Sequence, residues 1–398
     1  NPAAIQSNAK GISSFMNPNP FHPAGANWIN PSHPESQKFL RRVIETARDN
    51  GYGYIKIDFN GIGNRFVNPK LTRLQAFRQL YTLYREAAGE DMYILSCLGQ
   101  PTRGVVGFVD AARVGPDSHP AHFSHCLESV LRFQIFNRVW WNNDADVSYL
   151  DVKLPSRRVG STSQGVDMWR TWHNTVALTG GTAMISEPVN KPDVQEVWRN
   201  YEIMRPASRE SSRLLTLGKS GKNSIFGFSA DRVWGDFAVY NLYNSDKNKS
   251  ADITLNFADA GLPADTRCSV YNFWENKLVG YATDSYEGKN IPKNGSLLLR
   301  FTPLDGDSPK LVGSNLHLSM GATEIEQIYT TDQSLKIMLS GAGAQTGDLF
   351  FYSKNALEAG SSENCSISHV EGIGDNLWKV SIKGRIWNAN QSMVLNIN

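Results

Sequence analysis

The chain changes character near Leu217: helix-like and strand-like patterns alternate before it, and almost only strand-like runs follow it. In the first part, apolar residues recur at helical spacing in stretches that mostly stop at Gly or Asn, and a short β-rich run follows each stretch. Strict alternation of this kind predicts a parallel sheet covered by helices, either a doubly wound sheet or a (β/α)8 barrel. The predicted helices cover residues 33–50, 70–88, 122–137, 165–178 and 193–204, and the predicted strands cover residues 53–59, 92–98, 109–114, 138–141 and 182–186.

The second part predicts an antiparallel β-sandwich. From Ser224 onward, β-rich runs are separated by Gly, Asn, Asp and Pro at intervals of roughly ten residues, which is typical of sandwich folds. Residues 302–313 read as a linker or a sandwich edge, and the chain beyond about residue 323 could form a second small β module. We therefore divide the chain into an α/β part (1–217), a β-sandwich (218–305) and a β-rich extension or second β module (306–398).

Composition excludes several classes of partner. The 398 residues include 40 basic and 38 acidic side chains, so the net charge of +2 gives no electrostatic reason to expect nucleic acid or an anionic membrane. No stretch approaches the roughly 20 apolar residues that a bilayer-spanning helix needs. The four cysteines are scattered, with neither a CxxC pair nor the spacing of a disulfide framework.

The strand predicted over residues 53–59 carries two charged side chains. Residues two apart face the same side of a strand, so Lys56 and Asp58 share one face while Ile55 and Ile57 share the other. Because apolar residues flank them, the two charged side chains are not both expected to be surface groups. They could form a buried ion pair that fixes the strand. Alternatively, Asp58 is a catalytic carboxylate at the C-terminal end of a strand, kept ionised and nucleophilic by the cation beside it.

Two further acidic segments follow predicted strands. Arg113 ends one strand and Asp117 lies in the turn after it, which could be ordinary turn chemistry. Asp144 and Asp146 are expected in a loop after the strand 138–141. Their simplest interpretation is structural, as part of a solvated loop or as a helix N-cap. Their functional interpretation is a rim that binds hydroxyl groups, with Trp140 or Trp141 offering an apolar face to a sugar ring. Separate carboxylates at strand ends with aromatic platforms fit glycoside hydrolysis best.

Neither a metal nor a cofactor is expected. His119, His122 and His125 do not fall on one helical face, and no carboxylate completes a familiar ligand set. The glycine-containing stretches at residues 61–63 and 218–224 lack the spacing of nucleotide-binding loops. No G-x-S-x-G segment supports a serine nucleophile.

Six segments in order resemble the retaining α-galactosidase superfamily of glycoside hydrolases, families 27 and 36 (clan D). The segments are HPESQKF (33–39), YIKIDF (54–59), LSCLGQP (95–101), RVGPD (113–117), WWNNDAD (140–146) and TGGTAMIS (179–186). Residues 235–241 are also similar to the opening of the family's C-terminal β-domain. The resemblance implies that Asp58 is the nucleophile and Asp117 the acid/base. It implies that Lys56, Cys97 and Arg113 contact the substrate, and that Asp144 lies in the counterpart of an N-D-P-D motif.

The resemblance also implies a fold, and the sequence departs from the family pattern in several places. Residues 1–217 would be the C-terminal portion of a catalytic (β/α)8 TIM-type barrel, followed by the antiparallel β-sandwich. Residues 53–59 would be the fourth barrel strand, so the first strands are expected elsewhere, in a missing N-terminal segment or in another polypeptide. Ala145 replaces the proline of N-D-P-D, and Gly115 replaces the serine of the R-x-S-x-D element.

The activity expected from this resemblance is that of a retaining α-glycosidase acting as an α-galactosidase on a carbohydrate substrate. The expected site consists of Asp58 and Asp117 with Lys56, Cys97, Arg113, Trp141 and Asp144 as substrate-binding residues. Galactosyl transfer, α-N-acetylgalactosaminidase activity and non-catalytic carbohydrate binding are the alternatives. The resemblance favours a periplasmic or secreted location.

Overall fold

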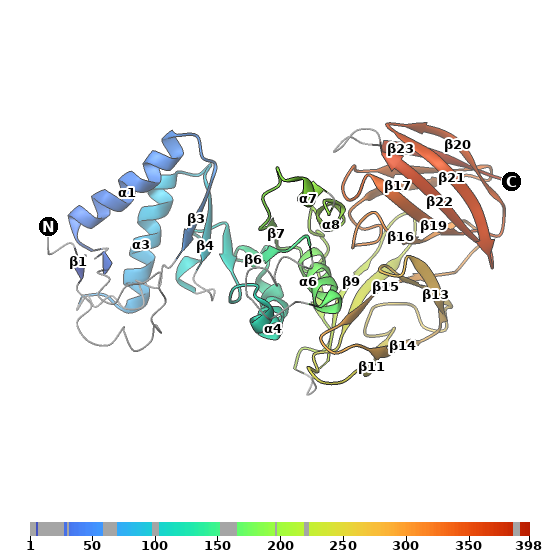
Figure 1. Cartoon of the computed structure of the whole chain (residues 1–398), viewed down its shortest axis with the longest axis horizontal. Coiled ribbons are helices and arrows are strands. Elements are labelled where there is room, and N and C mark those ends of the chain that lie inside the picture. The colour runs from blue at the N-terminus through green and yellow to red at the C-terminus, as the bar shows by residue number, and fades with distance from the viewer. Residues whose placement is uncertain are drawn as a thin grey trace. The chain divides into compact units, whose positions relative to one another are not determined.

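The computed structural model describes most of the chain, which forms two compact units (Figure 1). The first unit comprises Asn1–Pro116 and Arg138–Asp144, and the second comprises Asp117–Asn137 and Ala145–Asn398. The described residues are 5–6, 28–29, 32–58, 70–97, 103–151, 165–195, 197–218, 223–384 and 391–398.

The α/β part contains a five-stranded sheet whose spatial order, β3-β4-β5-β6-β7, equals the sequence order. β3 to β6 pair in parallel, so this is a parallel half-barrel, as the alternating pattern and the family resemblance predict. The strands are β3 (Tyr54–Asp58), β4 (Tyr93–Cys97), β5 (Ala111–Arg113), β6 (Asn142–Ser148) and β7 (Thr182–Ile185). A separate two-stranded pair is formed by β1 (Ile5–Gln6) and β2 (Trp28–Ile29).

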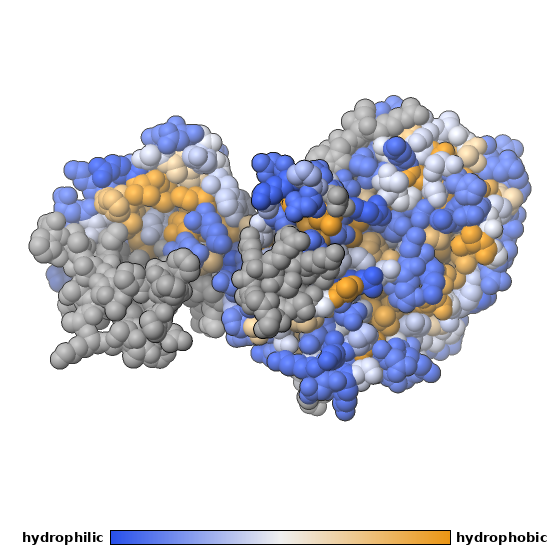
Figure 2. Space-filling view, in the orientation of Figure 1, coloured by the Kyte–Doolittle hydropathy of each residue, from blue (hydrophilic) through white to orange (hydrophobic). Residues whose placement is uncertain are grey.

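Four long helices accompany the sheet at the predicted positions: α1 (Pro34–Asp49), α3 (Arg73–Ala88), α4 (Phe123–Phe133) and α6 (Val166–Thr179). α3 begins at a capping box, in which the Thr72 side chain accepts from the Gln75 amide and the Gln75 side chain accepts from the Thr72 amide. Ile55 and Ile57 of β3 pack against a core that includes Phe77 and Tyr81 of α3. Figure 2 shows an apolar area over α1 and α3.

Two predicted elements were wrong in their bounds. Residues 138–141 form a turn, and the strand is β6, which contains the Asn-Asn-Asp-Ala-Asp stretch expected to be a loop. Its polar side chains are tolerated in a strand because tertiary partners satisfy them. The helix expected over 193–204 is instead two short helices, α7 (Pro192–Gln195) and α8 (Arg199–Glu202). Backbone hydrogen bonds from the amide of residue i to the carbonyl of residue i−3 occur between the two helices and in α8, as in 3₁₀ turns.

The β part begins with a six-stranded antiparallel sheet in the order β13-β12-β15-β10-β9-β8, which starts at residue 213, slightly earlier than the pattern predicts. A two-stranded sheet, β11-β14, lies with it around one core. The strands are β8 (Arg213–Leu214), β9 (Ser224–Ala230), β10 (Phe237–Tyr243), β11 (Ala251–Asn256), β12 (Cys268–Asn272), β13 (Lys277–Ala282), β14 (Ser285–Ile291) and β15 (Ser296–Pro303).

Two four-stranded sheets, β16-β19-β22-β21 and β17-β18-β23-β20, enclose a second core after residue 310. The strands are β16 (Lys310–Ser314), β17 (Ile325–Thr330), β18 (Ser334–Leu339), β19 (Thr346–Tyr352), β20 (Leu357–Glu363), β21 (Cys365–Gly374), β22 (Leu377–Gly384) and β23 (Gln391–Ile397). α6 joins the first β sheet through Asn174, whose Nδ2 donates to Asn241 Oδ1 at 2.8 Å. Of the helices described, none has the length and apolar character needed to span a membrane.

Candidate active site

Four polar side chains stand at one level across the parallel strands of the first unit. The register pairs Asp58 of β3 with Cys97 of β4, and it pairs Arg113 of β5 with Asp144 of β6. β4 and β5 pair up to the residues just before Cys97 and Arg113, so the level continues across all four strands. Three of these residues are the last of their strands. This is the edge at which parallel α/β folds place their chemistry.

Asp58 and Lys56 face the same side of β3, as predicted, but both are exposed. The expectation that the two could not both be surface groups was therefore wrong. β3 is the first strand in the sheet order, and only its other face, which carries Ile55 and Ile57, packs against the core.

Cys97 lies in the electrostatic field of three predicted site residues. Its side chain hydrogen-bonds with that of Asp58, and the charges of Arg113 and Lys56 act on its thiol. Burial raises the pKa of Cys97 to about 12, an effect that the two cations oppose and Asp58 reinforces. The thiol is thus neutral at physiological pH. The structure brings Lys56, Asp58, Cys97 and Arg113 together.

Arg113 and Asp144 form a buried ion pair. Arg113 Nε lies 3.0 Å from Asp144 Oδ2, and the side chains are 2% and 0% exposed. The pair therefore holds β5 to β6 within the row of polar side chains. Both residues were predicted to bind substrate, and in this structure they bind each other.

Sequence reasoning missed an aromatic pair on the same face. Tyr54, two residues before Lys56, stacks on Tyr93 with ring centroids 5.4 Å apart and an interplanar angle of 11°. Burial raises the pKa of Tyr54 to about 12, and the charge of Asp144 adds to that shift. The alternation of β3 was the signal that could have placed Tyr54 beside Lys56 and Asp58.

The two tryptophans before β6 have different environments. Trp141 is 4% exposed, belongs to the core under α3, and donates from Nε1 to Asn143 Oδ1 at 3.0 Å. Trp140 is 36% exposed and meets the Trp141 ring edge-on at 5.5 Å. Of the two sugar platforms that the sequence suggested, Trp140 has the accessible ring.

Asp117 belongs to the second unit, in the turn before α4, and its side chain is exposed. Its main-chain carbonyl accepts from the amide of His119 at 2.7 Å and from the thiol of Cys126 at 3.1 Å. The next amide, that of Ser118, donates to Asp146 Oδ2 at 2.8 Å. The turn therefore has a fixed backbone and an exposed carboxylate.

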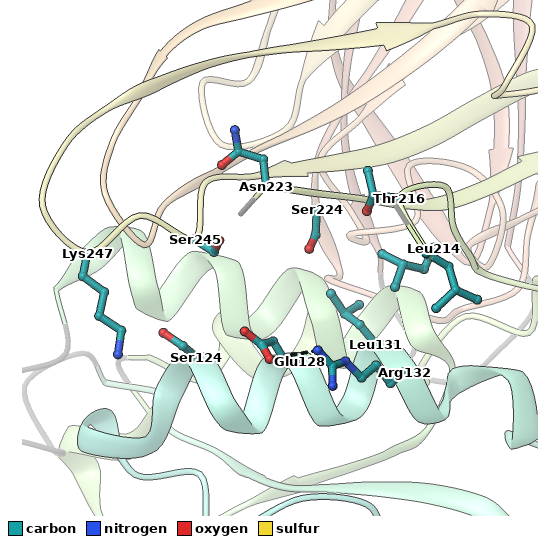
Figure 3. A pocket seen from close by; sticks show the side chains of 12 residues that line it. Ser124, Glu128, Leu131, Arg132, Leu214, Thr216, Asn223, Ser224, Ser245 and Lys247 are labelled. Carbon is teal, nitrogen blue, oxygen red and sulfur yellow. Dashed lines mark hydrogen bonds and ion pairs between the residues drawn. The ribbon is translucent and has the colours of Figure 1, made fainter. Parts of the chain in front are cut away.

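In the described part of the chain, no group of three or more His, Cys, Asp or Glu side chains is arranged to hold a metal ion. A cavity of about 370 Å³ lies between α4 and the first β sheet of the second unit (Figure 3). Ser124 and Glu128 of α4 point into it from one side, and Ser224 and Ser245 face them from the other. None of the predicted site residues lines this cavity.

Comparison with known proteins supports the fold assignment. Residues 230–301 match the family model described as the alpha galactosidase C-terminal beta sandwich domain. The fold is similar to that of a family 27 β-L-arabinopyranosidase from Geobacillus stearothermophilus, with a TM-score of 0.56 and 12% identity over 76% of this chain and 68% of that one. A structure of a variant of that enzyme with arabinose gives a TM-score of 0.54 and 11% identity, over 71% of this chain and 65% of that one.

The α-galactosidase I of Mortierella vinacea has a TM-score of 0.50 and 17% identity, over 66% of this chain and 71% of that one. The chain therefore spans about two thirds of the length of these relatives. In fold, its parallel half-barrel followed by an antiparallel β domain matches the corresponding parts of these family 27 glycosidase structures and of their α-galactosidase-like relatives.

Proposed function

We propose that this protein is a retaining α-glycosidase, with Asp58 as the nucleophile and Asp117 as the acid/base. The observation that supports it most is the exposed carboxylate of Asp58 at the C-terminal end of β3, beside Cys97 and on the same face as Lys56. The fold of family 27 enzymes and the match of the β-sandwich add support.

In the proposed reaction, Asp58 attacks the anomeric carbon while Asp117 protonates the departing oxygen. The resulting glycosyl-enzyme is then hydrolysed by water that Asp117, now a carboxylate, deprotonates. Lys56 would bind sugar hydroxyls, the buried pair of Arg113 and Asp144 would hold β5 beside β6, and the exposed ring of Trp140 would cover an apolar face of the sugar. No cofactor is needed for this chemistry.

The proposed substrate has a galactose-type ring. The relatives are named an α-galactosidase and a β-L-arabinopyranosidase, and these two sugars share the ring configuration but differ in the C5 hydroxymethyl group. Release of p-nitrophenol from the α-D-galactoside, the β-L-arabinopyranoside and the α-N-acetylgalactosaminide ranks the candidates. Product analysis with added sugar acceptors separates hydrolysis from galactosyl transfer.

The decisive variants concern Asp58. Asp58→Asn should abolish turnover, whereas Asp91→Asn, which alters an exposed carboxylate of the same unit, should leave it unchanged. Azide should rescue Asp58→Gly and yield the inverted β-glycosyl azide, because azide enters the cavity left by the nucleophile. A glycosyl azide of retained configuration would exclude Asp58 as nucleophile. Binding of galactose without release of p-nitrophenol from any of the glycosides would favour a non-catalytic binding protein.

A further inference from the structure

The turn that carries Asp117 is held by hydrogen bonds at the Asp117 carbonyl and at the next residue, Ser118. Its carbonyl accepts the His119 amide and the Cys126 thiol. Beyond it, the Ser118 amide donates to Asp146 Oδ2 at 2.8 Å, and the Ser118 hydroxyl donates to the Val147 carbonyl at 2.7 Å. Two of these four bonds come from β6, 28 and 29 residues further along the chain. The tertiary structure, and not the turn alone, therefore fixes the backbone at Asp117.

Asp146 reaches this turn from an unusual backbone conformation. Its φ is +76°, in the left-handed region that few residues other than Gly, Asn and Asp adopt, and the residue is 8% exposed. A buried carboxylate is costly unless donors satisfy it, and the Ser118 amide is one such donor. The buried side chain of Asp146 thus lies where it holds the residue next to Asp117.

We propose that Asp146 is a positioning residue that aims the Asp117 carboxyl at the departing oxygen; this inference rests on the proposed function of Asp117. The bond to the Ser118 amide fixes the peptide that follows Asp117, and that peptide sets the direction of the Asp117 side chain. A general acid works only within hydrogen-bond reach of the oxygen it protonates. Loss of the bond lets the turn drift, and a displacement of about 1 Å costs on the order of 100-fold in rate.

The test compares glycosides whose leaving groups need protonation to different degrees. A dinitrophenyl glycoside departs without an acid, whereas an alkyl glycoside requires one. Asp146→Ala should retain nearly the wild-type kcat/KM on the dinitrophenyl substrate and lose on the order of 100-fold on the alkyl substrate. Asp146→Asn should recover part of that loss, because the amide oxygen can still accept from Ser118. Asp193→Asn, an exposed carboxylate of α7, is the matched control.

Two failures are distinguishable. If Asp146→Ala lowers kcat/KM equally for both substrates while Asp117→Ala spares only the dinitrophenyl substrate, Asp146 is structural and the inference is wrong. If Asp117→Ala itself shows no dependence on the leaving group, the proposed function fails first. Thermal unfolding of each variant checks folding, and Asp146→Asn carries the comparison if Asp146→Ala does not fold. An Asn variant as impaired as the Ala variant would also contradict the inference.

Discussion

At the scale of single residues, the pair of Arg113 and Asp144 makes the most direct prediction. Removing one member of a buried ion pair leaves an uncompensated charge, so Asp144→Ala should lower the free energy of unfolding by about 3–5 kcal/mol. Urea denaturation measures this loss. The double variant Arg113→Met/Asp144→Leu, which removes both charges, should recover much of it. A cost below about 1 kcal/mol for Asp144→Ala would place the pair among weak surface bridges.

His173 predicts how stability depends on pH. Burial lowers the pKa of this residue of α6 from 6.5 to about 4, and its Nε2 has no hydrogen-bond partner among the described residues. Between these values the unfolded chain binds a proton that the folded chain does not, so stability falls as the pH falls below 6.5. Lowering the pH from about 7 to about 5 should reduce the free energy of unfolding of the wild type by about 2 kcal/mol more than that of His173→Phe. Urea denaturation at both pH values measures this difference. Equal losses of unfolding free energy in the wild type and in His173→Phe would contradict the prediction.

The sequence predicts some site residues and not others, for physical reasons. Alternation along β3 places Lys56 and Asp58 on one face because a strand has a period of two. Their exposure was not predictable, because it depends on which strands flank β3. The choice between Trp140 and Trp141 depends on a turn and on the core under α3, which no local pattern encodes. Asp146 looks like an ordinary loop residue until its contact with Ser118 is known.

At the scale of elements, the start of α3 depends on Thr72. Thr72→Ala removes the side chain that accepts from the Gln75 amide, so the variant should lose about 1 kcal/mol of stability in urea denaturation. Thr72→Ser keeps the acceptor and should match the wild type. Were the alanine variant equally stable, the capping box would contribute nothing beyond the packing of the helix.

The bounds of elements show where sequence patterns stop being informative. The capping box could have placed the start of α3 more closely than the expected residue 70, since Thr-x-x-Gln is a local signal. β6 could not be read locally, because Asn and Asp are typical of loops and become strand residues here through distant partners. Arg113 pairs with Asp144, and the Ser118 amide with Asp146. The parallel half-barrel itself was predictable, because alternation of helix and strand has few packing solutions.

At the scale of the whole second unit, Arg300 connects two of the β regions. Its guanidinium is fully buried and donates to the Leu311 carbonyl at 2.7 Å and to the Met320 carbonyl, while it lies 3.8 Å from the ring centre of Phe237. The sequence division at 305 and 306 therefore runs through a shared hydrogen-bond network. We expect β10 and β22, which lie on opposite sides of that division, to lose protection from hydrogen exchange at the same urea concentration.

In Arg300→Met, β10 and β22 should lose protection from hydrogen exchange at different urea concentrations. The substitution leaves the carbonyls of Leu311 and Met320 buried without this donor, at about 1–3 kcal/mol each, and it removes a buried polar link between the regions. Lys310→Met is the matched control, because it breaks only the bridge to the exposed Asp305, which is worth at most about 1 kcal/mol. Hydrogen exchange followed by mass spectrometry resolves both strands in one experiment. If β10 and β22 still lose protection together in Arg300→Met, their cooperativity comes from the other contacts between the regions, such as the packing of Tyr271 on Phe350 and the hydrogen bond from Asn276 to Asp348, and not from the buried guanidinium.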